Sequence, residues 1–210
     1  MPPSRLDPAL IAQRLAASQS MEAAKLEMPG QQKGLPWPAA VLLPLIRQDQ
    51  SWHLLFIRRA EQEHDRHSGE VAFPGGRAEN TDPDPVATAL REAREEIGLD
   101  PGEVEVLGCL RPLRTVSNYL VTPVVGHVRW PVPLQTAPVE VAEVFSLPLA
   151  WLSDPANRQL RIWPSKNHPQ AREVIFYEEF DGRRLWGISA RITLDFLQCL
   201  GVTLEPEAAS

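Results

Sequence analysis

Hydrophobic positions along the chain fall into short apolar runs and longer helical patterns, separated by turn residues. Runs rich in β-branched and aromatic residues predict strands, and the dipeptide Asp181-Gly182 predicts a tight turn between two of them. The predicted strands occupy residues 39–47, 51–59, 103–110 and 119–130, and the predicted hairpin occupies residues 172–187.

Apolar residues spaced three and four apart predict four helices, at residues 8–18, 85–97, 146–154 and 188–201. The second has clear end signals, because Asp84 suits an N-cap, Pro85 a first turn and Gly98 the left-handed residue past the end. Strands placed around one helix and followed by another predict an α/β fold of the α+β type. We expect a mixed sheet sandwiched between helices.

The 210 residues divide into three predicted parts. Residues 1–38 hold an accessory helix and a linker rich in Pro and Gly, residues 39–200 form one globular domain, and residues 201–210 form a flexible tail. The N-terminus has no continuous apolar segment of a signal peptide, and no apolar run reaches roughly 18 residues. These features predict a cytoplasmic protein with no membrane partner.

Composition narrows the function classes further. The formal charge of -6 disfavours a protein whose main role is to grip nucleic acid, so no nucleic-acid partner is predicted. Cys109 and Cys199 lack metal-ligand spacing and are expected to be reduced core residues. The sequence leaves the oligomeric state open, a homodimer included.

The helix at residues 85–97 carries three acids beside its apolar stripe. Glu92, Glu95 and Glu96 share a sector about 100° wide, next to the sector of Val86, Leu90, Ala93 and Ile97. Like charges at this spacing destabilise a helix by a few tenths of a kcal/mol each, and a bound divalent cation would reverse that effect. The alternative is a solvated charged face.

Glycines at a fixed distance before this helix favour the cation. The sequence PGG at residues 74–76 lets a backbone carbonyl approach a ligand without side-chain obstruction. Several carboxylates plus a carbonyl form the hard-oxygen set that Mg²⁺ or Mn²⁺ prefers.

The stretch GGRAENTDPDPVATALREAREEIGL resembles the Nudix box, G-x5-E-x7-R-E-U-x-E-E-x-G-U, in which U is aliphatic. REAREEIGL matches the second half, with Ala93 at the aliphatic position. In the first half Asp82 replaces the glutamate, and one extra residue precedes Arg91. This combination is similar to the coenzyme A pyrophosphatase branch of the Nudix hydrolases, and the resemblance runs from about residue 39 to about residue 200.

The resemblance implies roles for the matching residues. Glu92, Glu95 and Glu96 would hold the metal and polarise the attacking water, and the Gly76 carbonyl would be a further metal ligand. Arg91 would orient a box glutamate, with Asp82 in a supporting part. Glu140 takes the position of a recurrent glutamate that serves as a metal ligand or base, and Glu143 lies in the same segment. The catalytic base stays open between Glu95 and these loop acids.

The segment LLFIRRAEQEHDRHSGEVAFPGG resembles the second signature of the same branch. It implies substrate binding by Arg58, Phe73 and, across an insertion, Arg66 or His67; Asp65 stands where the branch has arginine. The implied activity is metal-dependent hydrolysis of the diphosphate of coenzyme A, a small-molecule substrate. The alternatives are a Nudix hydrolase for another nucleoside diphosphate derivative, such as ADP-ribose or a dinucleotide, and a catalytically silent binding module.

Overall fold

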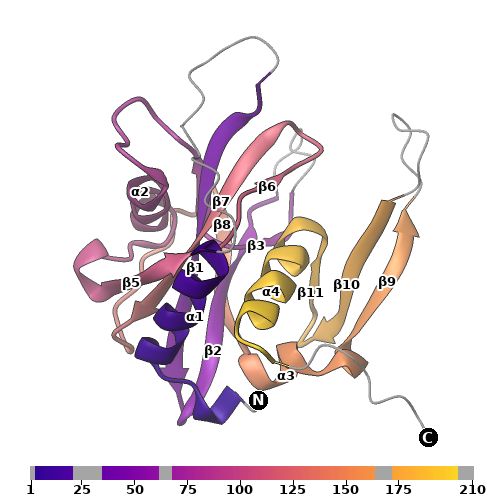
Figure 1. Ribbon diagram of the computed structural model, residues 1–210. Coiled ribbons are helices and arrows are strands. Elements are labelled where there is room, and N and C mark those ends of the chain that lie inside the picture. Colours follow the sequence, from indigo (N-terminus) through magenta and orange to yellow (C-terminus); the bar gives the residue numbers. More distant parts are fainter. Residues whose placement is uncertain (1–2, 21–34, 62–67, 164–171, 203–210) are drawn as a thin grey trace, which may run out of the picture.

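The computed structural model describes residues 3–20, 35–61, 68–163 and 172–202. Among these residues, eight strands form one mixed sheet with the central order β3-β2-β1-β7-β5, to which β4, β6 and β8 attach (Figure 1). Its strands are β1 (Trp37–Gln48), β2 (Ser51–Arg59), β3 (Val71–Ala72), β4 (Gly75–Arg77), β5 (Val104–Cys109), β6 (Leu113–Arg114), β7 (Tyr119–Val128) and β8 (Val141–Pro148).

Strand β1 organises this sheet. It pairs parallel with β7 and antiparallel with β2 and β4. Side chains from both of its faces are buried, Ala40, Leu42 and Ile46 on one and Leu43 and Leu45 on the other. A strand buried on both faces needs a nearly continuous apolar run, which is what residues 39–46 supply.

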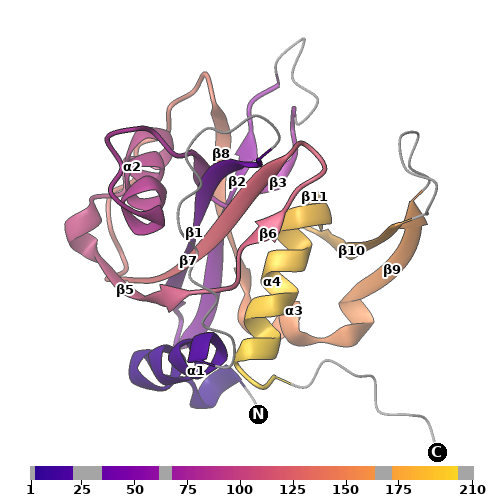
Figure 2. The same cartoon turned by 45° about the horizontal axis from the view of Figure 1, so that its top comes forward.

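Helices cover both faces of the sheet (Figures 1 and 2). Helix α2 (Pro85–Ile97) packs on one face, where Ala89, Ala93 and Ile97 meet the sheet. Helices α1 (Pro8–Ser20), α3 (Leu149–Ser153) and α4 (Gly187–Cys199) pack in the core on the other face. The predicted sandwich of a mixed sheet between helices is confirmed.

A small second sheet lies beside α4, with the strand order β11-β10-β9. It contains β9 (Arg158–Trp163), β10 (Arg172–Phe180) and β11 (Arg183–Trp186). The predicted hairpin is confirmed, because Asp181 and Gly182 both have positive φ, 48° and 76°. Short 3-10 turns are η1 (Pro3–Arg5), η2 (Pro101–Glu103) and η3 (Pro155–Asn157).

One predicted boundary is wrong. The expected helix at residues 146–154 begins only at Leu149, because Ser146, Leu147 and Pro148 belong to strand β8. Strand β8 was not predicted, although it pairs along the length of β2. Its burial alternates weakly, so tertiary pairing decides its conformation more than its pattern does.

The N-terminal helix is part of the main core. Ile11 and Leu15 of α1 have no exposed surface, and the Trp52 indole Nε1 donates to the Leu6 carbonyl at 2.9 Å. Within the described part of the chain, every helix is too short or too polar to cross a bilayer.

Candidate active site

Helix α2 begins and ends as its sequence predicts. The Asp84 carboxylate accepts from the Ala87 N–H at 2.8 Å, and Gly98 has a left-handed φ of 68°. The buried face lies further round the helix than expected, because Val86 and Leu90 are only partly buried while Glu96 is 3% exposed. Glu96 therefore lies within the buried face and not at its edge.

Strand β4 brings the glycine pair against this helix. Gly75 has a φ of 152°, and a Cβ there would lie 2.4 Å from the Ala40 carbonyl oxygen. A Cβ at Gly76 would lie 2.5 Å from Glu92 Oε1. The two glycines thus permit two close approaches, one between backbones and one between a backbone and a carboxylate.

Glu96 is a buried acid with one backbone partner. Its Oε2 accepts from the Gly75 N–H at 2.9 Å. Burial, together with the charges of Glu92 and Glu140, raises the pKa of Glu96 to about 8, although the Gly75 N–H and Arg59 act in the opposite direction. An isolated carboxylate in this position is unfavourable, so the site favours either a proton or a cation.

The Arg91 guanidinium contacts three acids, Glu92 and Glu95 of α2 and Asp82 before the helix. Its Nη1 donates to Glu92 Oε1 and to Glu95 Oε2, both at 3.0 Å, and its Nη2 lies 2.9 Å from Asp82 Oδ2. The Asp82 contact, with further bonds from Glu79 N–H and Thr88, lowers the pKa of Asp82 to about 2. Asp82 thereby fixes the guanidinium, which in turn orients two box glutamates.

Glu140 approaches the same acids from another segment. It lies in the turn before β8, and its carbonyl accepts from the Ala60 N–H at 2.8 Å. Burial raises the pKa of Glu92, and the negative charges of Glu95 and Glu140 add to this effect against Arg91. Because Glu140 acts on both Glu92 and Glu96, the structure brings it near these two acids.

The carboxylate and carbonyl oxygens at this site are of the type that a hard divalent cation prefers. Glu92 and Glu96 meet the backbone of the glycine pair, and the absent Cβ of Gly76 leaves room for a carboxylate there. As arranged, no group of three or more His, Cys, Asp or Glu side chains among the described residues is close enough to hold a metal ion. Arg91 and the Gly75 N–H occupy the carboxylate oxygens, so metal binding requires these side chains to turn.

The expected substrate residues lie in different surroundings. Arg58, at the end of β2, contacts Glu143 Oε2 of β8 through Nε at 3.4 Å. Phe73 is 3% exposed and its ring packs on Phe56 at 4.5 Å between centroids, which leaves little of the ring for substrate. Arg66 and His67 lie outside the described residues.

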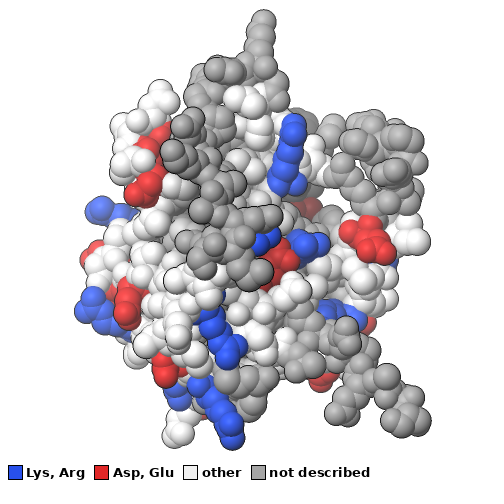
Figure 3. Space-filling model, viewed as in Figure 1, with Lys and Arg blue, Asp and Glu red and all other residues white. Residues whose placement is uncertain are grey.

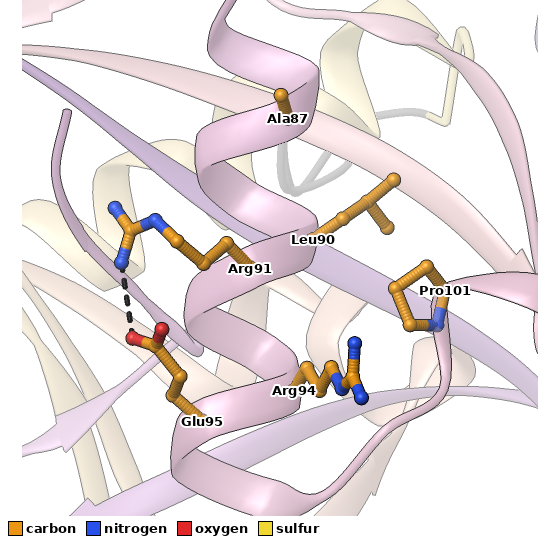
Figure 4. A pocket seen from close by; sticks show the side chains of 6 residues that line it. All are labelled: Ala87, Leu90, Arg91, Arg94, Glu95 and Pro101. Carbon is orange, nitrogen blue, oxygen red and sulfur yellow. Dashed lines mark hydrogen bonds and ion pairs between the residues drawn. The ribbon is translucent and has the colours of Figure 1, made fainter. Parts of the chain in front are cut away.

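A hollow of about 540 Å³ flanks the solvent side of α2 (Figure 4). Figure 4 shows Leu90, Arg94 and Pro101 on one side and the Arg91–Glu95 pair on the other. Glu92, Glu96 and Gly76 do not line it. The candidate site is the glycine pair, because Glu92 and Glu96 meet its backbone.

The sequence did not indicate two contacts near this site. The Gly75 N–H, beside the expected Gly76, is the donor to Glu96. Arg183 of β11 donates to Glu143 through Nε at 3.2 Å and through Nη2. Only the tertiary placement of the small sheet brings Arg183 there, so no local pattern marks it.

On the face drawn in Figure 3, acidic and basic side chains of the described residues are interspersed.

Comparison with known proteins identifies the family. The NUDIX domain model matches residues 36–170. The chain is 37% identical over 175 residues to an uncharacterized Nudix hydrolase NudL of Shigella flexneri, covering 79% of this chain and 83% of that one. It is 46% identical over 148 residues to an uncharacterized Nudix hydrolase NudL of Escherichia coli K12, covering 70% and 69%.

Among solved structures, the chain is similar to a MutT/nudix family protein from Enterococcus faecalis. The TM-score is 0.48 with 18% sequence identity, and the match covers 90% of this chain and 79% of that one. The family model and the NudL relatives give the classification. The chain belongs to the Nudix hydrolase family, whose members act on nucleoside diphosphate derivatives.

Proposed function

We propose that this Nudix hydrolase cleaves the diphosphate of coenzyme A or its derivatives, with Mg²⁺ or Mn²⁺, into 3′,5′-ADP and 4′-phosphopantetheine. The observation that supports the hydrolytic part is that Glu92 and Glu96 of α2 meet the backbone of the glycine pair, while the charge of Glu140 acts on both. Nudix hydrolases in general use divalent metals, which agrees with this set of donors.

The substrate part is supported by the sequence before the box. The segment from Leu54 to Gly76 resembles the coenzyme A branch, and Arg58 lies at the end of β2 with its side chain 41% exposed. An arginine in that position is available to an anionic group of the substrate.

In this proposal Glu92, Glu95, Glu96 and the Gly76 carbonyl hold the cation. The bound cation would neutralise the diphosphate and acidify a coordinated water. Arg91, fixed by Asp82, holds Glu92 and Glu95 in the metal-free arrangement, from which both would turn toward the cation. Either Glu95 or Glu140 accepts the proton of the attacking water. Arg59, which already lowers the pKa of Glu96, supplies a positive charge beside the site.

A second candidate is hydrolysis of another nucleoside diphosphate derivative, such as ADP-ribose or a dinucleotide. The observation that favours it is Asp65, which stands where the coenzyme A branch has arginine. An acid there would repel the additional phosphate of coenzyme A.

Incubation of the purified protein with coenzyme A, ADP-ribose and dinucleotides, with Mg²⁺ or Mn²⁺ and mass identification of products, tests the proposal. We expect hydrolysis of coenzyme A, and loss of activity in excess chelator. Glu92→Gln and Glu96→Gln should each lower kcat by orders of magnitude, because a neutral amide is a poorer hard ligand. Glu95→Gln and Glu140→Gln are assayed over a series of metal concentrations, because loss of the base lowers kcat even at saturating metal, whereas loss of a ligand raises the metal concentration required. Near-normal rates in both metal-ligand variants would show that the active site lies elsewhere.

A further inference from the structure

Two arginines from different sheets contact one carboxylate where β2 ends beside the start of β8. Arg58 of β2 and Arg183 of β11 both contact Glu143 of β8, so the cluster carries one net positive charge. Its side chains are partly exposed, 41% for Arg58, 25% for Arg183 and 30% for Glu143. The cluster is therefore both preassembled and open to a ligand.

The cluster packs against aromatic rings of the core. The Arg183 guanidinium lies 4.8 Å from the centre of the Phe145 ring, and Phe145 stacks on Phe56. A guanidinium held by a ring and a carboxylate loses little further freedom when it binds an anion. Among the described residues Arg58 reaches Glu143 through Nε alone, which leaves its terminal nitrogens for another acceptor.

The cluster is adjacent to the proposed active site. Arg58 pairs with Glu143 and Arg59 with Val141 in the β2–β8 register, and Glu140 immediately precedes that strand. Three residues of extended chain span roughly 10 Å, so Glu143 lies about that far from Glu140. Arg59 and Glu140 act on the buried acids, while the adjacent Arg58 lies on the opposite face of β2. A substrate whose diphosphate is bound at the acids would therefore reach the two arginines with a neighbouring group by passing around the end of β2.

We propose that Arg183, together with Arg58, binds a phosphate group of the substrate that lies outside the scissile diphosphate. This inference rests on the proposed function, because it assigns a position within the same substrate. It assigns a phosphate contact to β11, which is distant in sequence from Asp65. Nε and Nη2 of Arg183 donate to Glu143, and Nη1 donates to the Asp181 carbonyl at 3.2 Å. A phosphate would therefore meet the second hydrogens of the two terminal nitrogens, and Arg183 would then determine specificity.

Steady-state kinetics on coenzyme A and dephospho-coenzyme A, which differ by one phosphate, test this inference. We expect Arg183→Ala to raise KM for coenzyme A roughly tenfold, the effect of losing one charge-assisted contact, with kcat little changed. KM for dephospho-coenzyme A should stay near its wild-type value. Arg184→Ala is the matched control, because Arg184 follows on the same strand and pairs with Glu179 at 3.4 Å.

Equal damage to both substrates would reduce Arg183 to a structural tie and overturn the inference, as would no change with either. If Arg183→Ala does not fold, Arg183→Lys takes its place, since it keeps the charge and loses the paired donors. A KM increase confined to coenzyme A again supports the inference, and an unchanged ratio of the two KM values overturns it.

Calorimetric binding to the metal-free protein separates this inference from the proposed function. The probes are adenosine 3′,5′-bisphosphate and AMP, which require no turnover. Tighter binding of the bisphosphate, lost in Arg183→Ala and kept in Arg184→Ala, supports the phosphate site even if the protein does not hydrolyse coenzyme A. Equal binding of both probes to the wild type overturns it.

Discussion

At the scale of single residues, Glu96 concentrates the chemistry of the site. It is the buried charged residue of α2, and its partner is a backbone N–H and not a cationic side chain. Its neighbour Glu95 is 57% exposed and pairs with Arg91. Adjacent acids on one helix therefore have different properties, because one faces the sheet and the other faces water.

The raised pKa of Glu96 predicts how the metal-free protein responds to pH. The folded protein keeps the Glu96 proton up to about pH 8, whereas the unfolded chain releases it near the ordinary value of 4.5. Between these values the folded state binds more protons, so this group's contribution to stability is complete below the ordinary pKa and is lost as pH rises through the raised one.

Chemical denaturation in chelator at a series of pH values measures this contribution. We expect the free energy of unfolding of the wild type to fall, relative to Glu96→Gln, as pH rises from about 4.5 to about 8. A difference that is constant over this range would show that Glu96 titrates normally.

At the scale of elements, the short strand β4 has two glycines with different tasks. An added Cβ at Gly75 meets backbone, the Ala40 carbonyl oxygen and Val41 Cα, where nothing yields without disturbing the β1–β4 pairing. An added Cβ at Gly76 meets the carboxylate of Glu92, the end of a flexible side chain. One glycine serves the fold and the other serves the site.

We therefore expect Gly75→Ala and Gly76→Ala to fail in different ways. Gly75→Ala should lower the thermal midpoint strongly, because its φ of 152° and its backbone clash both penalise a side chain. Gly76→Ala should fold with a modest loss of stability and should lose most metal-dependent turnover, because Glu92 is displaced. Thermal denaturation and activity assays on both variants measure the contrast; a stable, fully active Gly76→Ala protein would contradict it.

Elements with a local signal were predictable from the sequence, and elements made by pairing were not. Asp84, Pro85 and Gly98 specify the ends of α2 within the helix itself. Strands β3, β4 and β6 are two or three residues long, too short to show any period. Arg183 reaches Glu143 across 40 residues of sequence, and that contact depends on how two sheets pack.

At the scale of the whole molecule, the helix expected to be accessory contributes to the main core. Ile11 and Leu15 belong to the same buried cluster as Leu43, Phe56 and Phe196. Helix α1 packs closely on β5, because a Cβ added at Gly108 would lie 3.1 Å from Leu15 Cβ. The domain boundary at residue 38 stays a prediction, while α1 packs against the main core.

A core substitution in α1 tests this packing. Ile11→Ala should lower the free energy of unfolding of the whole protein by about 2–5 kcal/mol, as at other fully buried positions. Gln13→Ala, on the exposed side of the same helix, should change it by less than about 0.5 kcal/mol. Urea denaturation followed by tryptophan fluorescence measures both. An unchanged midpoint for Ile11→Ala would mean that α1 is dispensable to the core.

The parallel pairing of β1 with β7 also sets the order in which the chain can assemble. Its first register pair joins Trp37 to Tyr119, residues far apart in sequence, whereas β1 and β2 meet through a short local turn. Closing a long loop costs entropy before its contacts stabilise it, so the local hairpin can form early and the parallel pair late. Because α2 packs on both β1 and β7, we expect the acids of α2 to reach their final positions only after β7 has paired with β1.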